Sequence, residues 1–168
     1  AAQILPFFPP NISKFYEPFA GSAAISLAAL NQRCVQSVHL NDVLSPLMRL
    51  WQEIAEHPAH IADQYEALWQ AQLSDPRHFF DQTRAEFNRD HQPAKLLYLL
   101  ARCVKNAVRF NSKGEFNQSA DHRRLGTKPD RMRKQILGAG SLLQNRLNTS
   151  CIDYEALLIQ ATDRDLIY

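Results

Sequence analysis

The chain has 168 residues, the usual size of one domain, and a formal net charge of only +2. Its 45% hydrophobic and 21% charged residues are typical of a globular protein and argue against disorder. No stretch approaches the ~20 uninterrupted apolar residues of a membrane-spanning helix, and prolines interrupt the apolar first ten residues, so we expect no secretory signal, no membrane partner and a cytoplasmic location.

The first 56 residues alternate between strand and helix patterns. Residues 15–21 form an aromatic, β-prone run that ends in Gly21, and residues 22–30 are small and helical in pattern. Residues 35–40 predict a second strand, and apolar positions at helical spacing follow between 44 and 55. This βαβα order predicts a parallel α/β sheet.

The middle of the chain predicts a helical insert followed by a hairpin. Residues 57–106 are helical in pattern, and Pro58, Pro76 and Pro93 each suit the start of a helix. Residues 108–118 alternate around Asn111-Ser112-Lys113-Gly114, a turn signature in which Gly114 can adopt a positive φ.

The end of the chain predicts a return to the sheet. A helix is expected over residues 128–147, a strand over 149–152, a helix over 154–161 capped by Asp153, and a last strand over 165–168. The three cysteines, Cys34, Cys103 and Cys151, show neither disulfide nor zinc spacing, so we expect them to pack in the core. The six histidines are scattered, and we expect no metal site.

Basic residues gather in one segment. Between Arg102 and Lys134 there are ten Lys or Arg and three Asp or Glu, whereas the rest of the chain holds nine bases and fourteen acids. Such an imbalance is typical of a surface that binds a polyanion. A solvated basic face would show the same composition.

Three predicted strand ends carry candidate ligand-binding residues. In a parallel α/β sheet, ligands bind where strands end and loops lead into helices. The Gly21 loop, Asp42 about 20 residues further on, and Asp153-Tyr154 all occupy such positions. Singly, each fits a turn or a helix N-cap, and the chain lacks the G-x-G-x-x-G fingerprint of pyrophosphate sites. In order on successive strands, they favour an adenosine-type cofactor.

The same segments resemble a known family. The chain is similar to the D12 class of adenine-specific DNA methyltransferases, the group that includes the Dam enzymes, in residues 15–24, 41–42, 104–119, 151–154 and 165–168. The resemblance implies a Rossmann-like class I methyltransferase fold, an α/β fold with a helical and β-hairpin insert that recognises DNA. It also implies transfer of a methyl group from S-adenosylmethionine to the 6-amino group of a flipped adenine in double-stranded DNA.

The resemblance further assigns regions and residues. Residues 1–56 would begin the methyltransferase domain, residues 57–147 would form the target-recognition insert, and residues 148–168 would return to the sheet. The implied cofactor-binding residues are Glu17, Pro18, Phe19, Ala20, Gly21, Ser22, Asp42, Asp153 and Tyr154. The implied DNA-binding residues are Lys105, Arg109, Asn111, Lys113, Asn117, Arg123 and Arg124. Among these we expect Arg109 to contact a base edge and Lys113, Arg123 and Arg124 to contact phosphates.

Two motifs of the family are not in the chain. The Lys-Trp-x-Gly-Gly-Lys element would lie just upstream of Ala1, and the catalytic Asp-Pro-Pro-Tyr would begin about two residues beyond Tyr168. We therefore expect no catalytic residue within the chain, and expect the chain to be a fragment that is inactive alone.

Departures from the family pattern leave several alternatives open. Ala23 stands where a second glycine is usual, and residues 117–124 do not follow the Dam-like ending. The chain is closer to restriction-modification methyltransferases, which would pair it with a cognate restriction endonuclease. The alternatives are a non-catalytic DNA-binding or specificity fragment of a split or degenerate methyltransferase, and a small-molecule or RNA methyltransferase.

Overall fold

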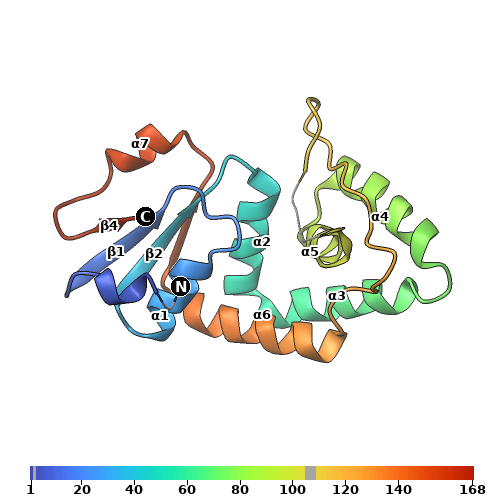
Figure 1. Ribbon diagram of the computed structural model, residues 1–168, viewed down its shortest axis with the longest axis horizontal. Coiled ribbons are helices and arrows are strands. Elements are labelled where there is room, and N and C mark those ends of the chain that lie inside the picture. The colour runs from blue at the N-terminus through green and yellow to red at the C-terminus, as the bar shows by residue number, and fades with distance from the viewer. Residues whose placement is uncertain (2, 105–108) are drawn as a thin grey trace. The chain divides into compact units, whose positions relative to one another are not determined.

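The computed structural model describes residues 1, 3–104 and 109–168 (Figure 1). These residues form two compact units. Residues 1–56 and 138–168 make up the first, here called the α/β unit, and residues 57–137 make up the second, here called the helical unit. The predicted assignment of function to residues 1–56, 57–147 and 148–168 stays a prediction.

The α/β unit is built on a parallel sheet, as the sequence predicted. Its strands lie in the order β3-β2-β1-β4 and all pair in parallel. A Rossmann sheet has the same order for its first four strands, with the topological switch point between β1 and β4. The strands are β1 (Ile12–Glu17), β2 (Val35–Asn41), β3 (Leu147–Ser150) and β4 (Leu166–Ile167).

Apolar residues of the strands and of the first helix form the core of this unit. Phe15 of β1, Val38 and Leu40 of β2, and Ala29 are all fully buried, as expected for a parallel sheet covered by helices. The helical elements are the 3₁₀ helix η1 (Leu5–Phe7), α1 (Ala24–Asn31), α2 (Ser45–Glu56) and α7 (Tyr154–Leu158). Helix α6 (Pro129–Leu143) begins in the helical unit and continues into the α/β unit from Gly138.

Proline begins each of the first three helices of the helical unit, which confirms the predicted starts. They are α3 (Pro58–Ala71), α4 (Pro76–Asp90) and α5 (Pro93–Arg102). Proline suits a first helical turn because the N–H that it lacks would have no partner there. Helix α5 packs against both α3 and α4, around fully buried side chains that include Tyr65, Phe87 and Tyr98.

Several predicted element ends are wrong. Helix α5 ends at Arg102 rather than near 106, because Cys103 pairs with Ala120 in an antiparallel bridge. Helix α6 ends at Leu143 and β3 covers 147–150 instead of 149–152. Asn145 adopts a positive φ of 58° between them, and pairing of Leu147 with Val38 fixes where β3 begins.

Smaller errors concern the last helix and the cysteines. Helix α7 ends at Leu158, short of the predicted 161, and the last strand is limited to residues 166–167. Cys103 is buried as predicted, but Cys151 is exposed and Cys34 is only half-buried.

Candidate functional site

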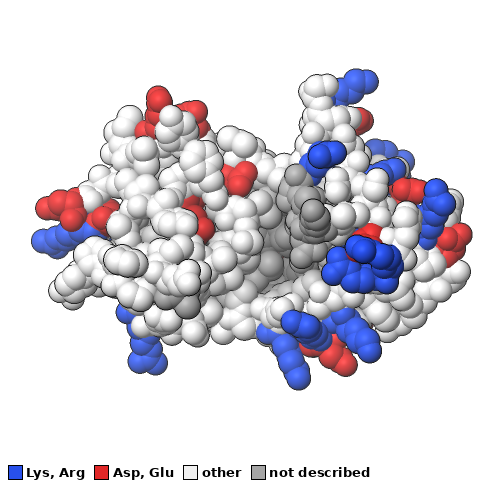
Figure 2. Space-filling view, viewed as in Figure 1, with Lys and Arg blue, Asp and Glu red and all other residues white. Residues whose placement is uncertain are grey.

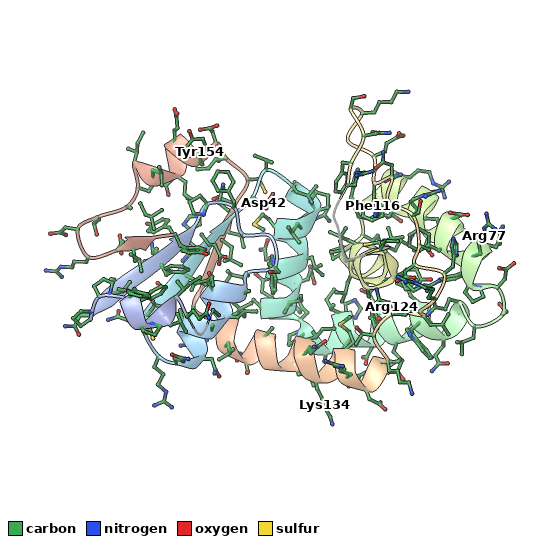
Figure 3. All side chains as sticks on the ribbon, viewed as in Figure 1. Asp42, Arg77, Phe116, Arg124, Lys134 and Tyr154 are labelled. Atoms are coloured by element: carbon green, nitrogen blue, oxygen red, sulfur yellow. The ribbon has the colours of Figure 1, made fainter. Side chains whose placement is uncertain are left out.

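Asn41 joins the carboxyl ends of three strands. Its side-chain Nδ2 donates to the carbonyls of Pro18 (3.1 Å) and Ile152 (3.0 Å). Its Oδ1 accepts from the Ile152 N–H (3.1 Å) and from the Ser150 hydroxyl (2.6 Å). Because all four bonding positions of the amide are used, the segments after β1 and β3 are tied to the end of β2. The three predicted strand ends therefore come together; Figure 3 labels Asp42 and Tyr154 at this edge of the sheet.

The turn after β1 contains two residues in the left-handed region. Gly21 has φ +46°, and no atom outside residues 20–22 lies within 4 Å of the position where a Cβ would stand. Ala23 has φ 49° and is fully buried, and its N–H donates to the Ala20 carbonyl at 2.7 Å. Because glycine adopts positive φ without steric cost, the conformation of Ala23 explains why a glycine suits this position in the family.

Side chains from two other elements hold the Gly21 peptide groups. The Trp51 indole N–H, on α2, donates to the Gly21 carbonyl at 3.1 Å. The Gly21 N–H donates to Oδ2 of Asp42 at 3.3 Å, and Oδ1 of Asp42 accepts from the Leu44 N–H at 3.0 Å. Since each carboxylate oxygen has two lone-pair sites, Asp42 keeps acceptor capacity beside the open space at Gly21. The sequence analysis missed both Asn41 and Trp51.

Glu17 is buried at the end of β1 and caps α1. Its Oε2 accepts from the N–H of Ser26 (3.2 Å) and from the Ser26 hydroxyl (2.5 Å). The N-cap residue Ala23 has no side-chain oxygen to supply this bond, so Glu17 satisfies one of the free N–H groups of the first helical turn. Burial raises the pKa of Glu17, while the two bonds from Ser26 act in the opposite direction.

Exposed apolar side chains surround the same strand ends. Phe19 and Tyr154 are 72% and 42% exposed, and their ring centroids lie 5.6 Å apart. Asp153 caps α7 as predicted, through its Oδ1 and the Glu155 N–H at 2.8 Å. Val43, directly after Asp42, is 81% exposed. The sequence analysis missed Val43, although an apolar residue between a strand end and a helix start was a usable signal.

The other cofactor candidates differ in exposure. Ser22 is exposed in the turn, whereas Pro18 and Ala20 are buried. The structure thus brings the predicted cofactor residues to one edge of the α/β unit, with carboxylate acceptors, an open glycine turn and exposed aromatic rings.

In the helical unit, residues 109–117 form the predicted hairpin. Phe110 and Phe116 pair in an antiparallel bridge, and the Asn117 N–H donates to the Arg109 carbonyl at 3.0 Å. Gly114 has the expected positive φ, +76°. Lys105, the first predicted DNA-binding residue, lies outside the described residues.

Asn111 closes the hairpin turn with its side chain. Its Oδ1 accepts from the N–H groups of Lys113 (2.9 Å) and Glu115 (3.0 Å), and its Nδ2 donates to the Glu115 carboxylate (2.8 Å). The DNA contact predicted for Asn111 stays a prediction. Arg109, Lys113 and Asn117 have exposed side chains.

Helix α4 anchors the returning arm of the hairpin. The Asn88 side chain accepts from the N–H of Phe116 (2.8 Å) and donates to its carbonyl (3.1 Å). The Phe116 ring is buried, with Phe87 and Phe110 edge-on at centroid distances of 6.2 and 5.6 Å. The sequence analysis missed Asn88, which gives no local signal because its partner lies 28 residues away.

The segment after the hairpin turns its carbonyls inward. Arg102, only 2% exposed, donates to the carbonyls of Asp121 (3.3 Å) and Arg124. Gln72 donates to the Leu125 carbonyl at 3.0 Å, and the Tyr65 hydroxyl donates to the carbonyl of residue 127 at 2.7 Å. The carbonyls of residues 121, 124, 125 and 127 are thereby turned away from the surface.

Arg123 and Arg124 project outward from this segment. Their side chains are 82% and 64% exposed, and both pair with the Asp121 carboxylate, at 3.0 and 2.8 Å. Hydrogen bonds from Arg123, and secondarily from Arg124, hold the pKa of Asp121 well below its usual range. The two arginines therefore share one compensating negative charge.

The structure reduces the number of bases that the basic segment can present. Arg102 is buried, and Arg133 bonds with Asp63 (2.5 Å) and Glu66 (3.0 Å) on α3. Lys and Arg side chains nevertheless spread over the face of the helical unit seen in Figure 2. The exposed members of the segment are Arg109, Lys113, Arg123, Arg124, Lys128, Arg131 and Lys134.

The strand order and the ligand edge define the chain as a Rossmann-like α/β protein. Residues 1–168 match the family model of the D12 class N6 adenine-specific DNA methyltransferases, and the chain belongs to this family. The comparison with proteins of curated function gave no match. Among the residues that the structure describes, no helix is long and apolar enough to cross a membrane.

Proposed function

We propose that the chain carries the S-adenosylmethionine site and the DNA-recognition unit of an enzyme that methylates the 6-amino group of a flipped adenine. The observation that carries this proposal is the placement of Asp42 at the joined strand ends, with free acceptor capacity beside the open Gly21 turn. When bound, S-adenosylmethionine supplies an electrophilic methyl group.

The chemistry of the edge fits this cofactor. Asp42 has oxygen acceptors for ribose hydroxyls, as acids at the end of the second strand do in nucleotide-binding sheets. The space at Gly21 admits the methionine part close to the backbone, because no Cβ occupies it. Phe19, Tyr154 and Val43 offer exposed apolar surface for the adenine ring, and Asp153 offers an acceptor for its amino group.

The course of β4 supports the expected position of the catalytic loop. Ile167 pairs with Tyr16, and the Tyr168 N–H donates to the Tyr16 carbonyl at 3.0 Å. An Asp-Pro-Pro-Tyr element that follows Tyr168 would run beside Pro18 and Phe19, at the switch point of the sheet. Its acceptors would then hold the adenine amino group next to the bound methyl donor, once the base has left the DNA stack.

The helical unit supplies candidate contacts to double-stranded DNA. Arg109 projects from the hairpin and is our candidate for a base contact, since arginine bound to guanine is the commonest specific contact in the major groove. Lys113, Arg123 and Arg124 are exposed, as contacts to phosphates require, and Asn117 is a second candidate base reader.

The cofactor assignment is tested by removing the two carboxylates. We expect Asp42→Ala and Asp153→Ala each to weaken S-adenosylmethionine binding by about 1–3 kcal/mol, the usual effect of losing a hydrogen bond to a charged group. Calorimetric titration measures the affinity. Asp163→Ala is the matched control, because Asp163 is an exposed carboxylate in the turn before β4. It lies at the amino-terminal end of the strands, away from the carboxyl ends that carry the proposed site. Unchanged affinity in both test variants would refute the assignment.

A further inference from the structure

The helical unit has a surface depression of about 190 Å³ that neither the proposed cofactor site nor the hairpin uses. Helix α4 forms one wall, and the chain segment that follows the hairpin forms the other. The lining residues on α4 are Arg77, Phe80, Asp81 and Arg84, and those on the segment are Ser119, Ala120 and His122. Figure 3 labels Arg77.

The charges of the depression leave one positive charge unmatched. Arg84 pairs with Asp81 at 3.1 Å, donates to the Gln118 carbonyl at 3.4 Å and lies over the Phe80 ring, 5.9 Å from its centroid. Arg77 lies two helical turns before Arg84 on the same face of α4 and is exposed. Within the described part of the chain, Arg77 has no ion-pair partner. Two guanidinium groups against one carboxylate suit a singly charged anion.

The neighbouring backbone favours an anion as well. Carbonyls of residues 121, 124, 125 and 127 accept hydrogen bonds from side chains inside the unit. The oxygen atoms that would repel an anion are thereby directed inward, while the Arg123 and Arg124 side chains beside them stay exposed. Both features favour an anion outside this segment.

The depression lies close to the hairpin along the chain. His122 follows Asn117 by five residues, and an extended chain spans at most about 3.3–3.6 Å per residue. The distance is therefore at most about 18 Å, which corresponds to roughly five base-pair steps of 3.4 Å. The hydrogen bond from Arg84 to Gln118 ties α4 to this stretch of chain.

We propose that the depression, the α4 anion site, binds one backbone phosphate of DNA within about five nucleotides of the bases that the hairpin contacts. The α4 anion site rests on the proposed function, because it requires that the helical unit binds duplex DNA. A phosphodiester carries one negative charge and accepts paired hydrogen bonds from guanidinium groups. Arg77 binds the phosphate. Arg84, held over the Phe80 ring, adds a second positive charge that offsets the Asp81 carboxylate.

The first test measures how DNA affinity depends on salt. Fluorescence anisotropy with a labelled duplex gives the slope of log affinity against log salt for the 168-residue protein. Arg77→Ala should lower the magnitude of this slope by about 1, the effect of losing one phosphate contact. Arg89→Ala is the matched control, because Arg89 is an exposed arginine on the same helix that does not line the depression. An equal reduction in both variants would overturn the α4 anion site.

Asp81→Asn gives a test of opposite sign. Removing the carboxylate leaves the depression with more positive charge, so DNA affinity at low salt should rise severalfold. If the Asp81–Arg84 pair served only to stabilise α4, the same variant would bind DNA equally well or more weakly, and the α4 anion site would be refuted.

The last test identifies the phosphate. In a series of duplexes, a neutral methylphosphonate replaces one flanking phosphate at a time. At one position, this replacement should weaken DNA binding by the unaltered protein but not by Arg77→Ala. Absence of such a position overturns the proposal. If the unaltered protein binds S-adenosylmethionine and duplex DNA but Arg77→Ala keeps its slope, only the α4 anion site fails. If the unaltered protein binds no duplex, the proposed function fails with it.

Discussion

At the scale of single residues, the buried carboxyl group of Glu17 couples the end of β1 to the start of α1. Burial is the largest influence on its pKa and raises it above the ordinary value of 4.5. Because this pKa is higher in the folded state than in the unfolded state, Glu17 contributes its full stabilisation only at pH values below its unfolded-state pKa. This contribution to the free energy of unfolding is lost as the pH rises through the folded-state pKa. Ionised Glu17 therefore lowers the free energy of unfolding at neutral pH.

We expect Glu17→Gln to remove this pH dependence. The glutamine oxygen can still accept both bonds from Ser26, and no charge is buried. Denaturant unfolding at about pH 5 and pH 8 should show that the variant gains stability relative to the unaltered protein as pH rises. Ser26→Ala should act in the opposite way, because its hydroxyl is one of the groups that lower this pKa. If Glu17→Gln instead lost stability relative to the unaltered protein between pH 5 and pH 8, the bonds from Ser26 would outweigh burial.

At the scale of elements, the hairpin depends on α4 for its position. One backbone bridge, Phe110 with Phe116, pairs the two arms, and a second, Cys103 with Ala120, joins residues outside the hairpin. An isolated hairpin is marginally stable at best in water. The two hydrogen bonds between Asn88 and the Phe116 peptide groups, with the buried Phe116 ring, fix the returning arm on the helix. The hairpin that carries Arg109 is thus anchored to α4 through Asn88 and Phe116.

Asn88→Ala should loosen the hairpin while leaving α4 folded. The loss of both bonds leaves the peptide groups of Phe116 without these partners, which costs about 1–3 kcal/mol for such groups. Hydrogen exchange at the Phe116 amide should become faster, while amides in the middle of α4 keep their protection. Asn88→Asp, which keeps the acceptor and loses the donor, should have an intermediate effect. Unchanged exchange at Phe116 would assign the anchoring to the aromatic rings alone.

At the scale of the whole molecule, the two compact units carry different proposed tasks. The cofactor residues all belong to the α/β unit, and the DNA-binding candidates all belong to the helical unit. A ligand that binds only the folded state stabilises the part that it contacts, by about 2.7 kcal/mol at a concentration of 100 times Kd.

Each ligand should therefore protect its own unit. In hydrogen exchange followed by mass spectrometry, S-adenosylmethionine should slow exchange in peptides that cover residues 17–44 and 150–155. Duplex DNA should slow exchange in residues 109–124. S-adenosylhomocysteine, which lacks the methyl group, is the control for the first ligand and should protect the same peptides. Protection of the helical unit by S-adenosylmethionine, without protection of residues 17–44, would contradict this division.

The sequence by itself determined the features that depend on local chemistry. Proline lacks an N–H, so Pro58, Pro76 and Pro93 marked three helix starts correctly, and Gly114 marked the hairpin turn because glycine tolerates its positive φ. Apolar periodicity predicted the βαβα order and hence the parallel sheet. Element ends were less accurate, because pairing with distant strands decides them: Leu147 begins β3 where it meets Val38.

Only the tertiary structure decided which side chains act together. Asn41 joins the strand ends through Ile152, 111 residues away, and Arg133 pairs with Asp63, 70 residues away. The basic segment of the sequence includes Arg102, yet this residue is buried and donates to the Asp121 carbonyl, 19 residues away. The residue type alone does not show whether a charged or amide side chain faces water or a hydrogen-bonding partner. Folding decides this, because it brings distant partners within hydrogen-bond distance.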